Sequence, residues 1–137
     1  MTDWLEYHEK PVTLHSGGTS HWLVRGDILF ANTHLREKVL DRWEYIVDLH
    51  RFQQQNLLVP LFYGIPTGGT CWAKAIAERT GGEVILKYKH SLFMFVVDDV
   101  MTTGASFAPF EHDIKLVVVK RLPQLNSEVL AWMELYI

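Results

Sequence analysis

Hydrophobic residues recur with two different periods along the chain, and the change of period separates helices from strands. Five apolar residues of the first half lie at helical spacing: Leu35, Val39, Trp43, Ile46 and Val47. This pattern predicts one long helix that ends near residue 55. Asn32 or Thr33 is suited to begin it, because either side chain can accept a bond from a first-turn N–H. A second helix is predicted over 71–80 and ends at Gly81-Gly82.

Short apolar runs predict the strands, at residues 57–63, 83–88, 92–97, 114–120 and 129–137. Two brief strands over 12–14 and 21–25 predict a hairpin with a glycine tip, and the mixed stretch 4–10 predicts a short helix. Residues 100–106 read as a loop. Strands that alternate with helices and end in glycine-rich loops favour an α/β fold with a mostly parallel central sheet flanked by helices.

Composition limits the classes of protein to which the chain can belong. Its 137 residues are 48% hydrophobic and 21% charged, which predicts one globular domain over 1–137. A net charge of -3 argues against a general nucleic-acid binder. The sequence has no run long enough to span a membrane and no secretory signal, and it contains one cysteine. We therefore expect a cytoplasmic protein with neither a nucleic-acid nor a membrane partner.

The loop after the run 92–97 carries the clearest chemistry. Asp98 and Asp99 come at the end of a predicted central strand, where ligands bind in parallel sheets. Carboxylates there can accept bonds from vicinal hydroxyls or help to hold a hydrated divalent cation. The residues that follow are small or carry hydroxyls, and their backbone N–H groups can form a nest for an anion. Acids beside such a nest predict a site for a phosphorylated sugar.

A second glycine-rich loop covers residues 63–70. It is not a Walker A loop, because Thr70 rather than lysine follows Gly69, and its glycine spacing does not fit a dinucleotide fingerprint. A glycine turn between a strand and a helix can bind an anion through its N–H groups. Taken alone, the same loop is equally well explained as a structural turn.

The string VVDDVMTTGAS at 96–106 resembles the phosphoribosyl-pyrophosphate (PRPP) motif of type I phosphoribosyltransferases. The resemblance implies that Asp98 and Asp99 bind the ribose 2- and 3-hydroxyls. It assigns the 5-phosphate to Thr102, Thr103, Gly104, Ala105 and Ser106. It assigns pyrophosphate to Thr67, Gly68, Gly69 and Thr70.

Residues 13–24 resemble a segment of orotate phosphoribosyltransferases that forms part of a hood over the base. By this resemblance the hood lies mainly in 1–31, and the base contacts come from His15, Ser16 and Gly17.

The resemblance implies an orotate-type enzyme of nucleotide metabolism and pyrimidine biosynthesis. Such a glycosyltransferase moves ribose-5-phosphate from PRPP to a nitrogen of a base and releases pyrophosphate. Its cofactor is Mg²⁺, which reaches Asp98 and Asp99 through the bound PRPP. Catalytic roles fall on these acids and on Lys87 and Lys89, which stand where the family has its catalytic loop. Members of this branch generally act as homodimers.

Two departures from the family favour an alternative, a PRPP- or nucleotide-binding regulatory protein without catalysis. His15 stands where the orotate enzymes have a lysine, and the segment 87–91 is too short for a closing lid. Release of pyrophosphate from PRPP distinguishes the two hypotheses.

Overall fold

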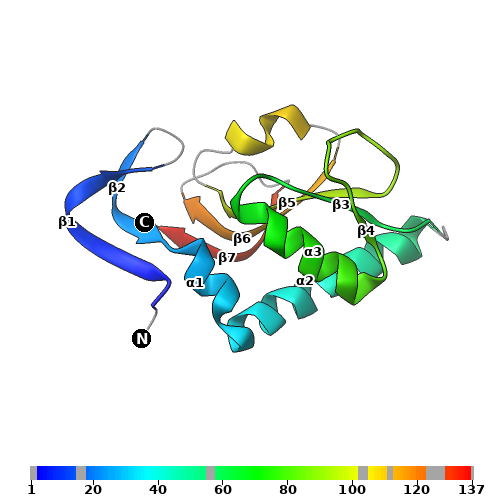
Figure 1. Ribbon diagram of the computed structural model, residues 1–137, viewed down its shortest axis with the longest axis horizontal. Helices are drawn as coiled ribbons and strands as arrows, with labels where there is room; N and C mark the ends of the chain where they lie inside the picture. Colours follow the sequence, from blue (N-terminus) through cyan, green and yellow to red (C-terminus); the bar gives the residue numbers. More distant parts are fainter. Residues whose placement is uncertain are drawn as a thin grey trace.

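A five-stranded parallel sheet lies at the centre of the computed structural model, as the sequence predicted (Figure 1). The structure describes residues 3–14, 18–54, 58–101, 105–110, 113–122 and 129–136. Along the sheet the order is β4-β3-β5-β6-β7, and every neighbouring pair is parallel. The bounds are β3 Leu61–Gly64, β4 Glu83–Val84, β5 Met94–Met101, β6 Ile114–Leu122 and β7 Val129–Tyr136. The middle strand of the sheet, β5, carries the two acids.

Helices cover the two faces of the sheet. Alternate residues of β5 point to opposite faces: Phe95 and Val97 join one apolar cluster, while Val96 joins the other. The first cluster packs against α1 Gly26–Ala31, α2 Thr33–Gln54 and α3 Gly68–Thr80. The second packs against the 3-10 helix η1, Ala105–Phe110. These two layers hold the carboxyl end of β5 between them.

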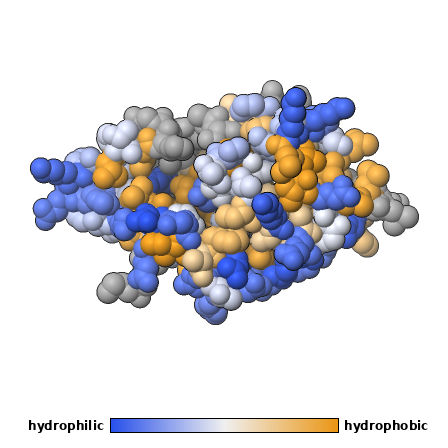
Figure 2. Space-filling view, in the orientation of Figure 1, coloured by the Kyte–Doolittle hydropathy of each residue, from blue (hydrophilic) through white to orange (hydrophobic). Residues whose placement is uncertain are grey.

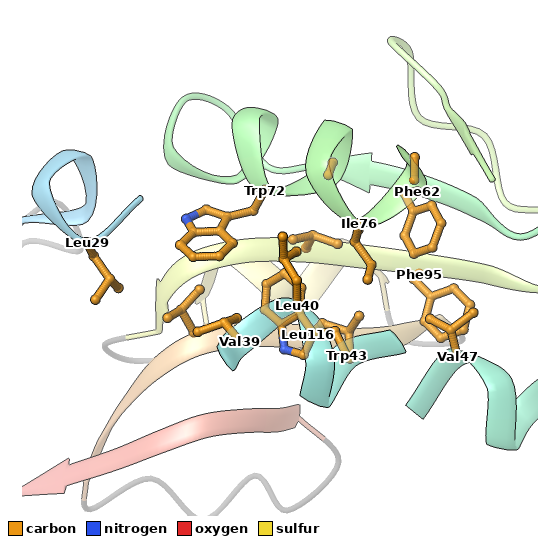
Figure 3. Close-up of a cluster of buried hydrophobic side chains, with 14 of the residues drawn as sticks. Leu29, Val39, Leu40, Trp43, Val47, Phe62, Trp72, Ile76, Phe95 and Leu116 are labelled. Atoms are coloured by element: carbon orange, nitrogen blue, oxygen red, sulfur yellow. The ribbon is translucent and has the colours of Figure 1, made fainter. Parts of the chain in front are cut away.

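The larger core is built on aromatic rings from the helices and the sheet (Figure 3). Trp43 of α2 and Trp72 of α3 are completely buried and meet edge to face, with ring centroids 5.6 Å apart. Phe62 and Phe95 stack between neighbouring strands at 5.3 Å. Such rings contribute large buried apolar areas. They fix α2 and α3 on the sheet, and α3 begins at the candidate site.

The chain begins with an antiparallel hairpin of β1 Leu5–Thr13 and β2 Thr19–Val24. The predicted hairpin is confirmed, but the predicted short helix over 4–10 is wrong. Leu5 and Tyr7 lie opposite Val24 and Trp22, so this stretch satisfies its backbone groups across the hairpin. Hydrophilic side chains gather over this hairpin, at the left of Figure 2.

Both predicted helices are confirmed, with one boundary moved. The N–H of Leu35 donates to Asn32 Oδ1 at 3.1 Å, so Asn32 caps α2. Helix α3 starts at Gly68 rather than 71, and Gly81 ends it with a left-handed φ of 69°. The short α1 was not predicted. No helix in the described part of the chain is both long and apolar enough to cross a membrane.

Several strand boundaries differ from the predicted ones. Strand β3 begins at Leu61, after Pro60, whose ring leaves no N–H for a sheet bond. Strand β4 keeps only two residues of the predicted 83–88. Strand β5 continues to Met101, because Val100 and Met101 still pair with β6. The first two residues of the predicted loop 100–106 are therefore strand, and both acids lie inside the ladder.

Candidate active site at the carboxyl end of β5

The two acids occupy adjacent positions near the end of β5. Asp98 is only 7% exposed, whereas Asp99 is partly exposed. The N–H of Asp99 donates to Asp98 Oδ1 at 2.8 Å, and the N–H of Val100 donates to Asp99 Oδ1 at 2.8 Å. No ion pair to a described residue engages either carboxylate. The acids are thus fixed by backbone bonds, and acceptor capacity is left over for a ligand.

Burial changes the proton affinity of the first acid. Desolvation, and then the charge of Asp99, raises the pKa of Asp98 to about 8. Asp98 therefore holds a proton at neutral pH. A protonated carboxyl can donate one hydrogen bond and accept others, which suits a hydroxyl partner.

The predicted pyrophosphate loop lies against the acids. Ile65 donates its N–H to Val97 O at 2.8 Å, which ties the loop to β5 just before Asp98. A Cβ on Gly68 would overlap the carboxylate of Asp99, and a Cβ on Gly69 would lie 3.1 Å from the Cα of Asp98. The peptide bond between Pro66 and Thr67 is cis. The structure thus brings Gly68 and Gly69 together with the acids.

The loop leads directly into the first turn of α3. Thr67 is the N-cap residue, but its side chain makes no capping bond. Gly69 donates its N–H to Ile65 O at 2.8 Å, and Thr70 donates to Thr67 O at 3.3 Å. The positive end of the helix dipole therefore faces the same region as the acids, an arrangement that favours a bound anion.

Several predicted residues fall outside the described part of the chain. These are His15, Ser16 and Gly17 of the hood, and Thr102, Thr103 and Gly104 of the phosphate motif. The motif continues into described backbone at Ala105 and Ser106, which open η1.

No contact among the described residues joins Lys87 or Lys89 to the acids. Both lysines are exposed and flank Tyr88, whose hydroxyl donates to Asp113. The Nδ1 of His90 lies 2.7 Å from the same carboxylate. Asp113 lies immediately before β6, and Asp98 pairs with Val117 of that strand. Four residues separate Asp113 from Val117, a distance of roughly 13 Å along the strand. The catalytic role of these lysines stays a prediction.

Sequence reasoning missed Arg121, near the end of β6. It is 5% exposed, and its Nη2 donates to Trp22 O of the hairpin at 2.7 Å. Its Nε and Nη1 are buried, and no described residue accepts a hydrogen bond from them. Burial lowers the pKa of this guanidinium. The signal in the sequence was a charged residue at the end of an apolar strand.

Comparison with known proteins identifies the fold. No protein-family model matches the sequence, and no curated protein matches it. Among solved structures, orotate phosphoribosyltransferase from Aeropyrum pernix is 21% identical, with a TM-score of 0.65 over 96% of this chain and 88% of that one. UMP synthase from Leishmania donovani is 18% identical, with a TM-score of 0.67 over 96% and 34%.

A third solved structure is an adenine phosphoribosyltransferase from Trypanosoma brucei, in complex with AMP, pyrophosphate and ribose-5-phosphate. It is 10% identical, with a TM-score of 0.60 over 96% of this chain and 75% of that one. The chain has the fold of the type I phosphoribosyltransferases. Orotate and adenine enzymes both share it, so the fold alone does not select the acceptor base.

Proposed function

We propose that this protein is an orotate-type phosphoribosyltransferase. It transfers ribose-5-phosphate from PRPP to a ring nitrogen of a base and releases pyrophosphate. The observation that carries the proposal is the pair Asp98 and Asp99 at the end of β5, against the glycine loop that opens α3. Paired acids suit a diol, and the start of a helix suits phosphate oxygens.

Each group has a role in the proposed reaction. The acids orient the ribose through its hydroxyls, and the residues from Thr102 to Ser106 bind its 5-phosphate. Thr67, Gly68, Gly69 and Thr70 bind the pyrophosphate as it leaves. The C1–oxygen bond breaks as positive charge builds on the sugar ring, so the protein acts by positioning and electrostatics.

The donor set fits Mg²⁺ only together with a substrate. The described residues include no cluster of three or more histidine, cysteine or acidic side chains that could hold a metal ion. Two carboxylates beside a phosphate-binding loop are nonetheless the oxygen donors that Mg²⁺ prefers, and Mg²⁺ commonly completes its shell with substrate phosphates and water. Bound through PRPP near Asp98 and Asp99, Mg²⁺ would neutralise negative charge on the leaving pyrophosphate.

Arg121 favours an acceptor that carries a carboxylate or carbonyl oxygens. Its two unpartnered nitrogens, Nε and Nη1, are buried beside the hairpin that the resemblance assigns as the hood. A buried guanidinium with unpaired N–H groups and no counter-charge is costly, and an anionic group offsets that cost. Orotate has these groups, whereas adenine has neither.

The test replaces both acids with uncharged amides, which removes the charge of Asp99 and the acidic proton of Asp98. Asp98→Asn with Asp99→Asn should weaken PRPP binding in the presence of Mg²⁺ by about ten-fold or more, since hydrogen bonds to charged groups contribute about 1.5–3 kcal/mol each. Calorimetry measures the affinity. A charge-matched control, Asp48→Asn with Glu78→Gln, changes two exposed acids on α2 and α3. Equal affinity in the parent and the double variant would rule out the proposed site.

A second candidate function is PRPP or nucleotide binding without catalysis. The short segment 87–91, and the lack of any contact between its two lysines and the acids among the described residues, favour it. Pyrophosphate release with a panel of bases that includes orotate and adenine separates the candidates. Binding of PRPP without turnover of any base would favour the binding protein.

We also propose that the enzyme acts as a homodimer whose second copy supplies a lysine to the site. Light scattering should give twice the mass of the chain. Mixing Asp99→Asn with Lys89→Ala should then restore part of the activity that each variant lacks. A monomeric mass, or no recovery on mixing, contradicts this arrangement.

A further inference from the structure

We propose that Gly26 is a positioning residue for Asp99, so that the junction between the β1–β2 hairpin and α1 forms one wall of the acid site. The contact itself is independent of the reaction. Its consequence for ligand binding rests on the proposed function. The proposal joins two segments that lie 73 residues apart in the sequence.

The contact leaves no room for a side chain. A Cβ on Gly26 would overlap Oδ2 of Asp99 and lie 3.1 Å from its Cγ and 3.5 Å from its Cβ. Gly68 borders the same carboxylate from the loop that opens α3, where a Cβ would lie 2.5 Å from Oδ1. Two glycines from different segments thus enclose the second acid, and Val100 holds its other side through a backbone N–H.

The response to a side chain differs among the glycines of the site. At Gly64 the nearest atoms are backbone atoms of Gly69 and Thr70, and at Gly69 the nearest is Val97 O. A methyl group there must displace main chain, which costs stability. At Gly26 all three nearest atoms belong to the Asp99 side chain. The carboxylate can rotate away instead, so a methyl group at Gly26 moves the acid and leaves the fold in place.

Neighbouring bonds fix the place of Gly26. The N–H of Arg25 donates to Trp4 O at 2.6 Å, and Trp4 is 4% exposed in the core. The Arg25 side chain bridges Glu6 of β1 and Asp27 of α1. These exposed ion pairs contribute little energy. The buried tryptophan and the backbone bond make the junction a fixed wall.

The first experiment compares two glycines at opposite ends of β2. Gly26→Ala should weaken PRPP binding by about ten-fold, because it displaces a charged hydrogen-bonding group. It should leave the melting temperature nearly unchanged, since alanine also favours the helix that begins there. Gly18→Ala is the control for the melting temperature, because nothing lies within 4 Å of a Cβ at that position. Equal binding by the Gly26→Ala variant and the parent would overturn the proposal.

The second experiment shows whether Gly26 acts through Asp99. In an Asp99→Ala background there is no carboxylate to displace, so adding Gly26→Ala should weaken binding no further. If the two losses add, Gly26 acts on the ligand by another route and the proposal is wrong.

A third measurement separates this inference from the proposed function. Burial, together with the charge of Asp99, raises the pKa of the Cys71 thiol, and Cys71 is the one cysteine in the chain. The pH profile of thiol alkylation therefore responds to the position of Asp99 without any ligand. Asp99→Ala should shift the profile to lower pH, and Gly26→Ala should also move it. If PRPP does not bind the parent but the profile moves, the proposed function fails and the contact stands. An unmoved profile in Gly26→Ala overturns the contact.

Discussion

At the scale of single residues, the first acid is the unusual group of this protein. Asp98 is nearly buried, and burial together with the charge of Asp99 raises its pKa to about 8. In the unfolded chain this carboxyl has its ordinary pKa of 3.8. Between these two values the folded state keeps a proton that the unfolded chain has lost. Raising the pH through this window therefore destabilises the fold, because the folded state must then bury a charge.

Asp98→Asn should remove this dependence. The variant should be more stable than the parent. The difference between their free energies of unfolding should widen from pH 5 to pH 8 by on the order of a few kcal/mol, because one pKa unit corresponds to about 1.4 kcal/mol. Urea unfolding at the two pH values measures it. Asp48→Asn, on the exposed side of α2, is the control and should show no such widening. A difference in unfolding free energy that stays constant between pH 5 and pH 8 would mean that Asp98 is ionised over this whole range.

At the scale of elements, the ends of helices and strands decide where the site lies. Strand β5 runs past both acids because Val100 and Met101 pair with Val119 and Lys120. Helix α3 starts three residues earlier than its apolar pattern predicted, because Gly68 and Gly69 can pack closely on the end of β5 where larger residues cannot. The acids and the helix start meet for this reason.

The cap of α2 gives a test at this scale. Asn32→Ala removes the side-chain oxygen that accepts the N–H of Leu35, so the free energy of unfolding should fall by about 1 kcal/mol. Asn32→Asp keeps an acceptor and should stay close to the parent. Denaturant unfolding measures both, and PRPP affinity should not change in either. An equal loss in both variants would show that the cap is not the cause.

At the scale of the whole molecule, the hairpin and the start of α1 each meet the sheet. Gly26 meets Asp99 of β5, and Trp22 O accepts a bond from Arg121 of β6. In Figure 1 the strand arrows of β6 and β7 point toward the hairpin, so it stands beyond the carboxyl ends of these strands. A ligand on the acids therefore has the hairpin as a neighbour.

Arg121→Met tests the acceptor side of this arrangement. The KM for the acceptor base should rise by about ten-fold or more, while the Kd for PRPP should stay the same, because the guanidinium lies beside the hairpin. Stability should not fall steeply, since methionine fills a similar volume without an unpaired buried charge. Lys10→Met on the exposed hairpin surface is the charge-matched control. An unchanged KM would separate Arg121 from acceptor binding.

The sequence by itself determined the two long helices, the parallel sheet and the positions of the acids. Each of these follows from local information: a helical repeat from Leu35 to Val47, continuous apolar runs, and two carboxyls after such a run. The tertiary structure decided what depends on partners distant in sequence. Residues 5–10 became part of a strand because residues 22–24 pair with residues 5–7. The contacts of Tyr88 and His90 with Asp113, of Arg121 with Trp22 O and of Gly26 with Asp99 join residues far apart in the chain, so no local pattern predicts them.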